Sequence, residues 1–257
     1  GSALFSELLM IASNRALGIT FYGTTAFGLL GTAVASAGFV DNTGIQGLLL
    51  GSPTASDGNS NTGIVYLILA DGAIAPTHSP TFSPSAAPLP LYNDIDLRSI
   101  HSNGMGLALK GESVVGGLGR AVSILGDVDG DGVDDFAVGA PSESPEGRAS
   151  AGVVYVIRGN YSLAGINEDF SMANLTLSKR GIRILGASAG DGLGLGLTGV
   201  DLNGDSIVDI AVGAPNAIYL SSTNAGVVYV LFGRTMLFSF GDIDLSLFSD
   251  GSMGYRI

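Results

Sequence analysis

Short apolar segments recur along the chain, separated by glycine and polar residues. Between residues 118 and 186 there are four of them, at 118–125, Asp135–Gly139, Gly152–Arg158 and Gly181–Leu185. Each has the length of a strand rather than of a helix, and valine, isoleucine and tyrosine, which favour extended backbone, are common in them. This pattern predicts four antiparallel strands that run from the inner to the outer edge of one sheet.

The same pattern is found three times, over residues 24–111, 116–186 and 191–257. A further strand-like segment lies at 17–23, so we interpret residues 1–23 as an N-terminal segment with an orphan outer strand. Four-stranded antiparallel units at a long, regular spacing are typical of β-propeller blades. We therefore predict an all-β fold with three propeller-type blades. Propellers close with about four to eight blades, so three blades do not close a ring by themselves.

Residues 73–90 interrupt the first unit with a segment rich in proline, serine and threonine. Such a composition favours an extended, exposed conformation, and both a spacer loop and a site of O-glycosylation fit it. After this insertion, Asp94-Ile-Asp-Leu97 is echoed by Asp242-Ile-Asp-Leu245. The echo extends the repeat beyond its four strands.

Two acidic loops lie between the first and second strands of the second and third units. They read Asp127-Val-Asp-Gly-Asp-Gly-Val-Asp-Asp135 and Asp201-Leu-Asn-Gly-Asp-Ser-Ile-Val-Asp209. Oxygen-bearing side chains at alternate positions, with glycine between them, allow a short loop to converge on one cation. Oxygen ligands without nitrogen or sulfur favour calcium. An Asx-rich turn without metal is the alternative interpretation, since aspartate and glycine also favour turns.

We predict two calcium sites, because two matching copies argue against a plain turn. The expected ligands are the side chains of Asp127, Asp129, Asp131 and Asp135 with the Val133 carbonyl, and those of Asp201, Asn203, Asp205 and Asp209 with the Ile207 carbonyl. These loops are not EF-hands, because valine stands at the twelfth position of both and the flanking segments are strand-like. In the first unit the aligned positions keep one carboxylate, Asp41, so we expect no metal there.

Each acidic loop is followed by Ala-Val-Gly-Ala-Pro, at 137–141 and 211–215, and then by Ala-Gly-Val-Val-Tyr-Val, at 151–156 and 225–230. Phe27-Gly28 opens the first unit, and Leu-Gly takes its place in the other two. In this combination the sequence resembles the FG-GAP repeats of integrin α-subunit propellers and related extracellular proteins. The resemblance covers nearly the whole chain. It implies calcium-bearing β-propeller blades.

Composition narrows the possible partners and location. Only 13% of the residues are charged, against about 25% in a typical soluble domain, so the surface is expected to be neutral and polar or covered by glycan or protein. The net charge of −12 argues against nucleic-acid binding. No apolar run reaches the ~18 residues of a membrane helix.

The acidic loops and the sequons favour an extracellular or cell-surface location. Acidic loops of this kind need millimolar calcium if they bind it weakly, and the glycosylation sequons at Asn160 and Asn174 fit the same location.

No catalytic constellation stands out in the sequence. The chain has no cysteine and only two isolated histidines, His78 and His101, so we predict that it is not an enzyme. The leading hypothesis is an extracellular structural or adhesion module within a larger assembly or filament, whose partners are proteins, including copies of the chain joined head to tail through residues 3–23. The alternatives are a propeller that accompanies a hydrolase of the phospholipase D kind and a propeller that recognises a ligand on its loop face.

Overall fold

The computed structural model describes residues 21–41, 43–56, 61–69, 95–100, 104–159, 169–251 and 253–257. The predictions for residues 1–20, for the insertion at 73–90 and for Asn160 fall outside these ranges. Within them the regular structure consists of strands and short 3-10 helices. None of the described helices is long and apolar enough to cross a lipid bilayer.

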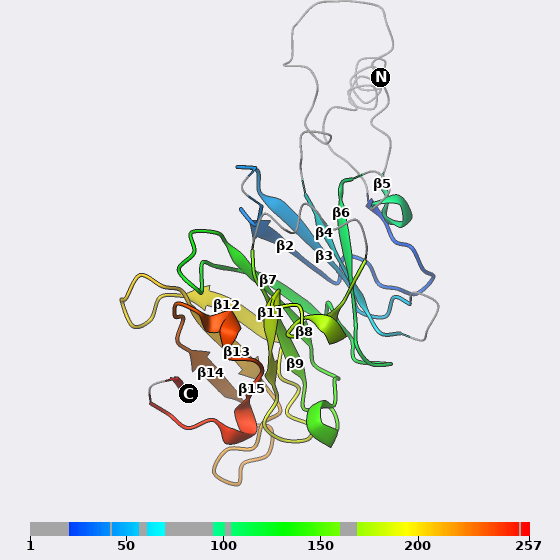
Figure 1. Ribbon diagram of the computed structural model, residues 1–257. Coiled ribbons are helices and arrows are strands. Elements are labelled where there is room, and N and C mark those ends of the chain that lie inside the picture. Colours follow the sequence, from blue (N-terminus) through cyan, green and yellow to red (C-terminus); the bar gives the residue numbers. More distant parts are fainter. Residues whose placement is uncertain are drawn as a thin grey trace, which may run out of the picture.

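Three sheets follow one another along the chain, and each contains four antiparallel strands that form one blade (Figure 1). Blade 1 consists of β2 (Ala33–Gly38), β3 (Gly47–Ser52), β4 (Ile64–Ile68) and β6 (Gly106–Lys110). Blade 2 consists of β7 (Ala121–Gly126), β8 (Asp135–Ala140), β9 (Val153–Ile157) and β11 (Gly181–Leu185). Blade 3 consists of β12 (Gly196–Val200), β13 (Asp209–Ala214), β14 (Val227–Leu231) and β16 (Gly254–Arg256). The predicted all-β fold with four-stranded, propeller-type blades is confirmed.

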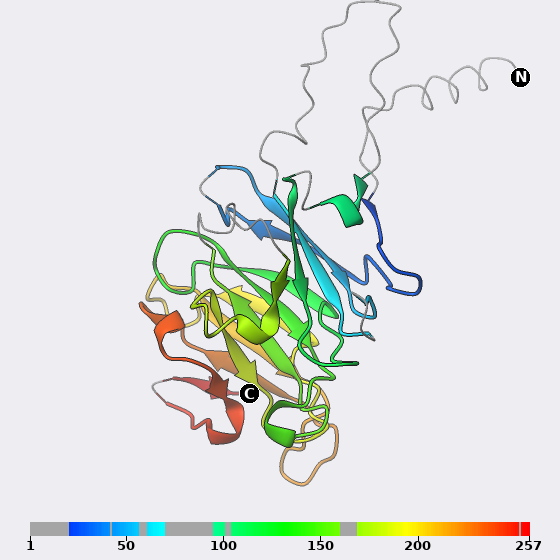
Figure 2. The same cartoon turned by 45° about the vertical axis from the view of Figure 1, so that its right-hand side comes forward.

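The first strands of the three blades lie next to one another, with β7 between β2 and β12. The blades therefore fan out from a shared inner edge, and Figure 2 shows the three sheets side by side from a second direction. This arrangement places the β2–β3, β7–β8 and β12–β13 loops of successive blades at the same end of the molecule. Both acidic loops belong to this set.

A short strand from each blade pairs with the outer strand of the blade before it. β10 (Phe170–Ser171) runs parallel to β6, and β15 (Ile243–Asp244) runs parallel to β11. In the same way β5 (Ile95–Asp96) runs parallel to β1 (Phe21–Tyr22). β1 thus occupies the position of an outer strand in front of blade 1.

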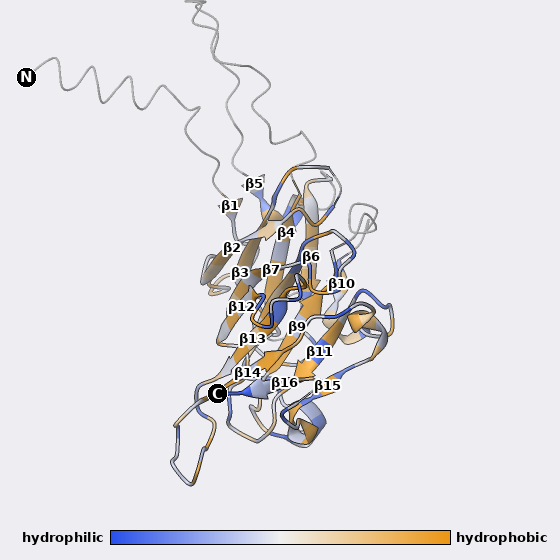
Figure 3. Cartoon of the chain, turned by 90° about the vertical axis from the view of Figure 1, so that its left-hand side faces the viewer, coloured by the Kyte–Doolittle hydropathy of each residue, from blue (hydrophilic) through white to orange (hydrophobic). Residues whose placement is uncertain are grey.

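The central strands are buried on both faces, and for this reason their sequences are continuously apolar. In β9, Val154 and Val156 face blade 3 while Val153, Tyr155 and Ile157 face blade 1, and all five are buried. In Figure 3 this appears as orange, hydrophobic colouring along the central strands of the sheets. The equivalent tyrosines Tyr66, Tyr155 and Tyr229 are only 2%, 0% and 4% exposed, so all three are part of the core.

The glycines of the repeated motif permit close contact between blades. Within blade 2 the Gly119 amide donates to the Gly139 carbonyl at 3.1 Å, and within blade 3 the Gly194 amide donates to the Gly213 carbonyl at 3.0 Å, so the turn that opens each blade lies over its own second strand. A Cβ added to Gly139 would lie 2.0 Å from the Gly194 carbonyl oxygen. The turn that opens one blade therefore fits only against a glycine in the second strand of its neighbour.

Candidate metal centre

The loop between β7 and β8 brings three carboxylates together. One oxygen each from Asp127, Asp129 and Asp135 lies within 4.8 Å of the other two. Among the described residues this is the one such acidic cluster. Asp129 and Asp135 are buried and Asp127 is half-buried, so the three charges repel one another in a place that water screens poorly.

Hydrogen bonds within the loop fix its curvature. Both oxygens of Asp127 accept from main-chain amides, Oδ1 from Gly130 at 2.7 Å and Oδ2 from Gly132 at 2.7 Å. Asp135 joins the loop to the blade, because its Oδ2 accepts from the Val128 amide at 2.9 Å and its Oδ1 from the Gly159 amide at 2.7 Å. The last ligand position is therefore tied to the end of β9.

Arg158 is the cation that faces this cluster. Its Nε lies 2.9 Å from Asp129 Oδ2, and its Nη2 lies 2.8 Å from Asp131 Oδ2. Asp131 is thereby held against the arginine, while the other three aspartates converge. The equivalent residue in the next repeat is Phe232. Sequence reasoning missed Arg158, although this difference between two otherwise matching repeats is a signal that could have identified it.

The electrostatics of the first loop favour a bound cation. Burial raises the pKa of Asp135 to about 8, although the amides of Val128 and Gly159 act in the opposite direction. Burial and the neighbouring charge of Asp131 also raise the pKa of Asp129, against the influence of Arg158. Both raised pKa values mean that the protein alone does not fully stabilise the negatively charged form of these carboxylates. An all-oxygen donor set with excess negative charge fits calcium.

The second loop, between β12 and β13, has the same turn but a more open setting. Asp201 accepts from the Gly204 and Ser206 amides at 2.7 and 3.0 Å, as Asp127 does from its glycines. Asp209 repeats the role of Asp135, accepting from the Leu202 and Gly233 amides. Residues 201–206 are all exposed. The loop therefore has the framework of the first site without its burial.

Blade 3 covers the first loop but cannot cover its own. The Val208 amide donates to the Asp127 carbonyl, and the Arg234 amide donates to the Val128 carbonyl, both at 3.1 Å. Val128 is 0% exposed, whereas the equivalent Leu202 is 49% exposed. The accessibility of the second loop thus follows from its place in the fan of blades and not from its sequence.

Ser206 differs from its counterpart Gly132 in a way that the backbone makes costly. Their φ angles are +70° and +87°, in the left-handed region that disfavours a side chain by about 1–2 kcal/mol. We predict that Ser206→Gly tightens calcium binding at the second loop by about fivefold, equivalent to roughly 1 kcal/mol. Calorimetric titration with calcium measures the change.

Gly132→Ala is the matched control for this prediction. A Cβ at Gly132 meets nothing within 4 Å, so strain alone should weaken the first site by a similar factor. If Ser206→Gly leaves the affinity of the second site unchanged while Gly132→Ala weakens the first, the predicted effect of backbone strain at Ser206 is wrong.

The corresponding loop of blade 1 is organised differently. Asp41 is 4% exposed, and its Oδ1 accepts from the Thr43 hydroxyl at 2.6 Å and from the Thr43 amide at 3.2 Å. This carboxylate is therefore engaged in a local turn. The prediction that blade 1 carries no metal site remains a prediction.

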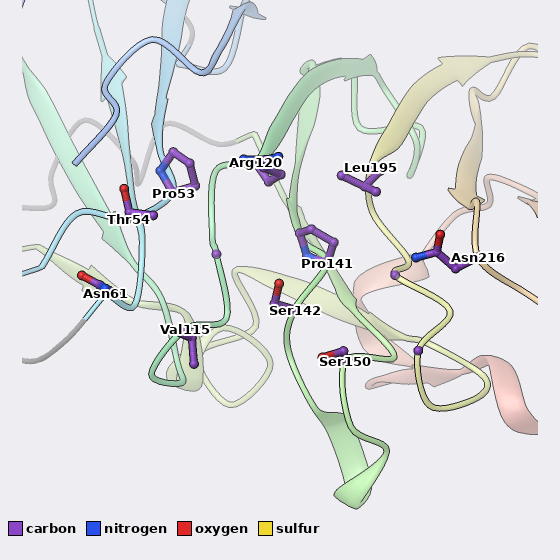
Figure 4. A pocket seen from close by; sticks show the side chains of 13 residues that line it. Pro53, Thr54, Asn61, Val115, Arg120, Pro141, Ser142, Ser150, Leu195 and Asn216 are labelled. Atoms are coloured by element: carbon purple, nitrogen blue, oxygen red, sulfur yellow. The ribbon is translucent and has the colours of Figure 1, made fainter. Parts of the chain in front are cut away.

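At the end of the molecule opposite the acidic loops, the three blades enclose a cavity of about 460 Å³. Equivalent positions of successive blades line it, including Thr54, Ser142 and Asn216 (Figure 4). Arg120 is the one charged residue in its lining. We call this end of the blades, formed by the β3–β4, β8–β9 and β13–β14 loops and by the links between blades, the loop face.

Of the two sequon asparagines, Asn174 lies within the described residues and Asn160 does not. Asn174 is exposed in the short helix Met172–Asn174. The hydroxyl of Thr176, the third residue of that sequon, donates to Asp242 at 2.6 Å. Glycosylation of Asn174 and Asn160 remains a prediction.

Fan-like blades and acidic loops together define a propeller-type repeat protein. The family model "FG-GAP repeat" matches residues 118–157 and 193–231, which are the first three strands of blades 2 and 3. The chain is 32% identical to integrin alpha-PS2 of Drosophila melanogaster over 182 residues, 68% of this chain and 11% of that protein. It is 38% identical to phosphatidylinositol-glycan-specific phospholipase D of Homo sapiens over 108 residues, 42% of this chain and 12% of that protein. It is also 39% identical to integrin alpha pat-2 of Caenorhabditis elegans over 116 residues, 43% of this chain and 8% of that protein.

These matches confirm the resemblance drawn from the motifs: the chain belongs to the FG-GAP repeat proteins. It is a module similar to parts of integrin α-subunits and of the phospholipase. The matched regions span 8 to 12% of these relatives, so the activities of the whole relatives do not carry over directly.

Proposed function

We propose that this chain is a non-enzymatic, extracellular or cell-surface module for adhesion or structural assembly, built from FG-GAP blades that calcium stabilises. The observation that supports it most directly is the convergence of Asp127, Asp129 and Asp135 in a loop whose pattern recurs at 201–209. Calcium would bind at both loops, through the two predicted ligand sets. In this proposal the metal holds each loop against the third strand of its own blade and, at the first site, against blade 3.

The proposal of protein partners rests on the face of blade 3 that no described segment covers. Val228 on this face is 40% exposed, whereas the equivalent Val154 of blade 2 is 0% exposed because blade 3 covers it. The contact between blades 2 and 3 shows which surface fits such a face, namely another FG-GAP blade. We propose that a further FG-GAP unit covers it, including a second copy of this chain bound head to tail, with residues 3–23 as the donated segment. Such contacts use different surfaces on the two partners and can extend into a filament.

Light scattering of the chain tests the proposed assembly. We expect a mass that rises with concentration above the 25.9 kDa of one chain. Val228→Glu should abolish the rise, because it buries an unpaired charge in the contact. Leu177→Glu, a change at a residue that is 85% exposed on blade 2, is the control and should leave assembly intact. A monomer at all concentrations, or assembly that Val228→Glu does not disturb, would refute the proposal. Removing residues 3–20 tests the donor role separately.

A second candidate function is ligand recognition on the loop face. The 460 Å³ cavity shown in Figure 4 has the size of a small-molecule or side-chain site. Ser142, Ser150 and Asn216 line it with groups that donate and accept hydrogen bonds. A module that accompanies a hydrolase is the third candidate, favoured by the similarity to the phospholipase. In that case the catalytic part would lie outside these residues.

A further inference from the structure

Arg158 stands at a position that is apolar in the other two repeats. It follows β9 directly, as Leu69 follows β4 and Phe232 follows β14. Leu69 is 6% exposed and belongs to the core of blade 1. An apolar side chain is therefore the pattern at the end of the third strand, and the arginine of blade 2 departs from it.

The arginine occurs together with a second difference between the acidic loops. The third position of the loop is Asp129 in blade 2 and Asn203 in blade 3. The predicted ligand positions of the first loop thus hold four carboxylates, and those of the second hold three. The positive charge of Arg158 offsets one of the four, so that both loops have the same net charge. The extra carboxylate and the extra cation belong to the same repeat.

These two residues face each other. Arg158 Nε lies 2.9 Å from Asp129 Oδ2, and Arg158 Nη2 donates to Asp131 Oδ2 at 2.8 Å. The first contact is an ion pair without an aligned hydrogen bond, because Nε has no hydrogen-bond partner. The side chain of Asp129 is 4% exposed and that of Arg158 is 33% exposed, so water screens this pair only in part.

Blade 3 also contacts the arginine. The guanidinium carbon lies 5.8 Å from the centre of the Phe238 ring, and Phe238 is 7% exposed. The Arg158 amide donates to the Arg180 carbonyl at 2.8 Å, which fixes the backbone at this position. The guanidinium therefore lies close to two carboxylates and to an aromatic ring, all of which favour a positive charge.

We propose that Arg158 is a built-in counter-cation of the first acidic loop, which competes with calcium for Asp129 and Asp131 and thereby sets the calcium affinity of that loop. A carboxylate that is shared between two cations stabilises each of them less, because the cations repel each other. Without calcium, the arginine offsets part of the repulsion between the clustered carboxylates. This role rests on the proposed function, since only a loop that binds calcium can be regulated in this way. The second loop, with Phe232 in place of the arginine, is free of this competition.

Calcium titration of Arg158→Met tests the competition, followed by the NMR signals of the Gly130 and Gly132 amides. We expect this variant to bind calcium at the first loop about tenfold more tightly than the parent, because a positive charge beside a divalent cation is removed. Arg158→Lys keeps the charge and should tighten binding by less than about threefold. The Gly204 amide reports on the second loop in the same sample, and the affinity there should not change.

Melting curves give a second readout, which in chelator requires no bound metal. A tenfold change in affinity is equivalent to about 1.4 kcal/mol, or roughly 3–6 °C for a chain of this size. Arg158→Met should therefore melt about 3–6 °C below the parent in chelator and close to the parent in saturating calcium, where the ion takes over the role of the arginine.

Two further variants show whether this effect comes from the facing charges. In the background of Asp129→Asn, which removes the extra carboxylate, Arg158→Met should lower the melting temperature in chelator by less than about half as much. Arg148→Met is the control, because it removes an arginine that lies 2.9 Å from Asp244 and not beside the acidic loop. It should lower the melting temperatures in calcium and in chelator equally.

The possible outcomes separate this role from the proposed function. If the first loop of the parent binds calcium and Arg158→Met binds it no more tightly, the competition is refuted and the calcium role of the loop stands. An equal loss of stability in calcium and in chelator would also refute it, since a structural residue behaves in this way. Calcium binding at the first loop that appears only in Arg158→Met would support the competition. No calcium-dependent change at Gly130 and Gly132 in any variant would overturn both the competition and the proposed calcium site.

Discussion

Removing calcium with a chelator should lower the melting temperature of this protein by about 5–10 °C. A ligand at a hundred times its dissociation constant stabilises the native state by about 2.7 kcal/mol, and each kcal/mol corresponds to roughly 2–4 °C for a chain of this size. Without the metal, the clustered carboxylates of Asp127, Asp129 and Asp135 repel one another. Because the first loop bonds to Val208 and Arg234 of blade 3, its loosening should also weaken the contact between blades 2 and 3.

Asp129→Asn and a control variant locate this effect. Asp129→Asn removes one charge from the first site and should reduce the calcium-dependent shift by about half. Asp41→Asn makes the same change in the blade 1 loop, where we expect no metal, and should leave the shift unaltered even if it lowers stability in both conditions. Identical melting curves in calcium and in chelator, or an unreduced shift in Asp129→Asn, would contradict the assignment of the first site. Differential scanning calorimetry measures all of these quantities.

Replacing Arg183 by methionine should destabilise the protein by about 1–2 kcal/mol, or roughly 2–8 °C. Arg183 donates to Asp242 at 2.6 Å and to Glu112 at 3.0 Å. It therefore links the segment that opens blade 2 with the connecting segment of blade 3. Methionine keeps the apolar stem but leaves two carboxylates, whose side chains are 33% and 23% exposed, without their cation. Urea unfolding in the presence of calcium gives the change in free energy.

The Arg98–Asp96 pair is the control, since the Arg98 side chain is 71% exposed. Arg98→Met should cost less than about 0.5 kcal/mol, and a similar cost for both variants would argue against the bridging role of Arg183. Burial opposes ionisation of Asp242, but hydrogen bonds from Arg183 and Thr176 outweigh it and lower the pKa of this carboxyl. A lowered folded-state pKa gives stability that is present above the unfolded value, near 3.9, and is lost as the pH falls further. The difference between Arg183→Met and the parent should therefore narrow below about pH 4.

The sequence by itself determined the type of fold and the places of the two acidic loops. Short apolar segments rich in valine, isoleucine and tyrosine and bounded by glycine identify strands, because segment length and backbone preference are local properties of the sequence. The repeat at a long spacing then identifies blades, since copies of one sequence pattern adopt one structure. The convergence of Asp127, Asp129 and Asp135 could also be predicted from their spacing, because a tight turn is formed by its own glycines and main-chain amides.

The pairing of β5, β10 and β15 with the preceding blade was decided by the tertiary structure. The Asp-Ile-Asp-Leu echo marked two of these strands, but a two-residue strand has no periodicity from which a partner can be deduced. The third reads Asp169-Phe-Ser-Met172 and escaped notice. A parallel partner is chosen by where the preceding outer strand lies, which depends on how the blades pack.

Tertiary structure likewise decided how the repeated residues differ. Two acidic loops of similar sequence become one covered and one exposed loop, because blade 3 packs on the first and no described segment packs on the second. Asp131, expected beside its neighbours, is turned toward Arg158 by an ion pair that a residue 27 positions away supplies. Such effects depend on contacts between blades, which the period of a single strand does not encode.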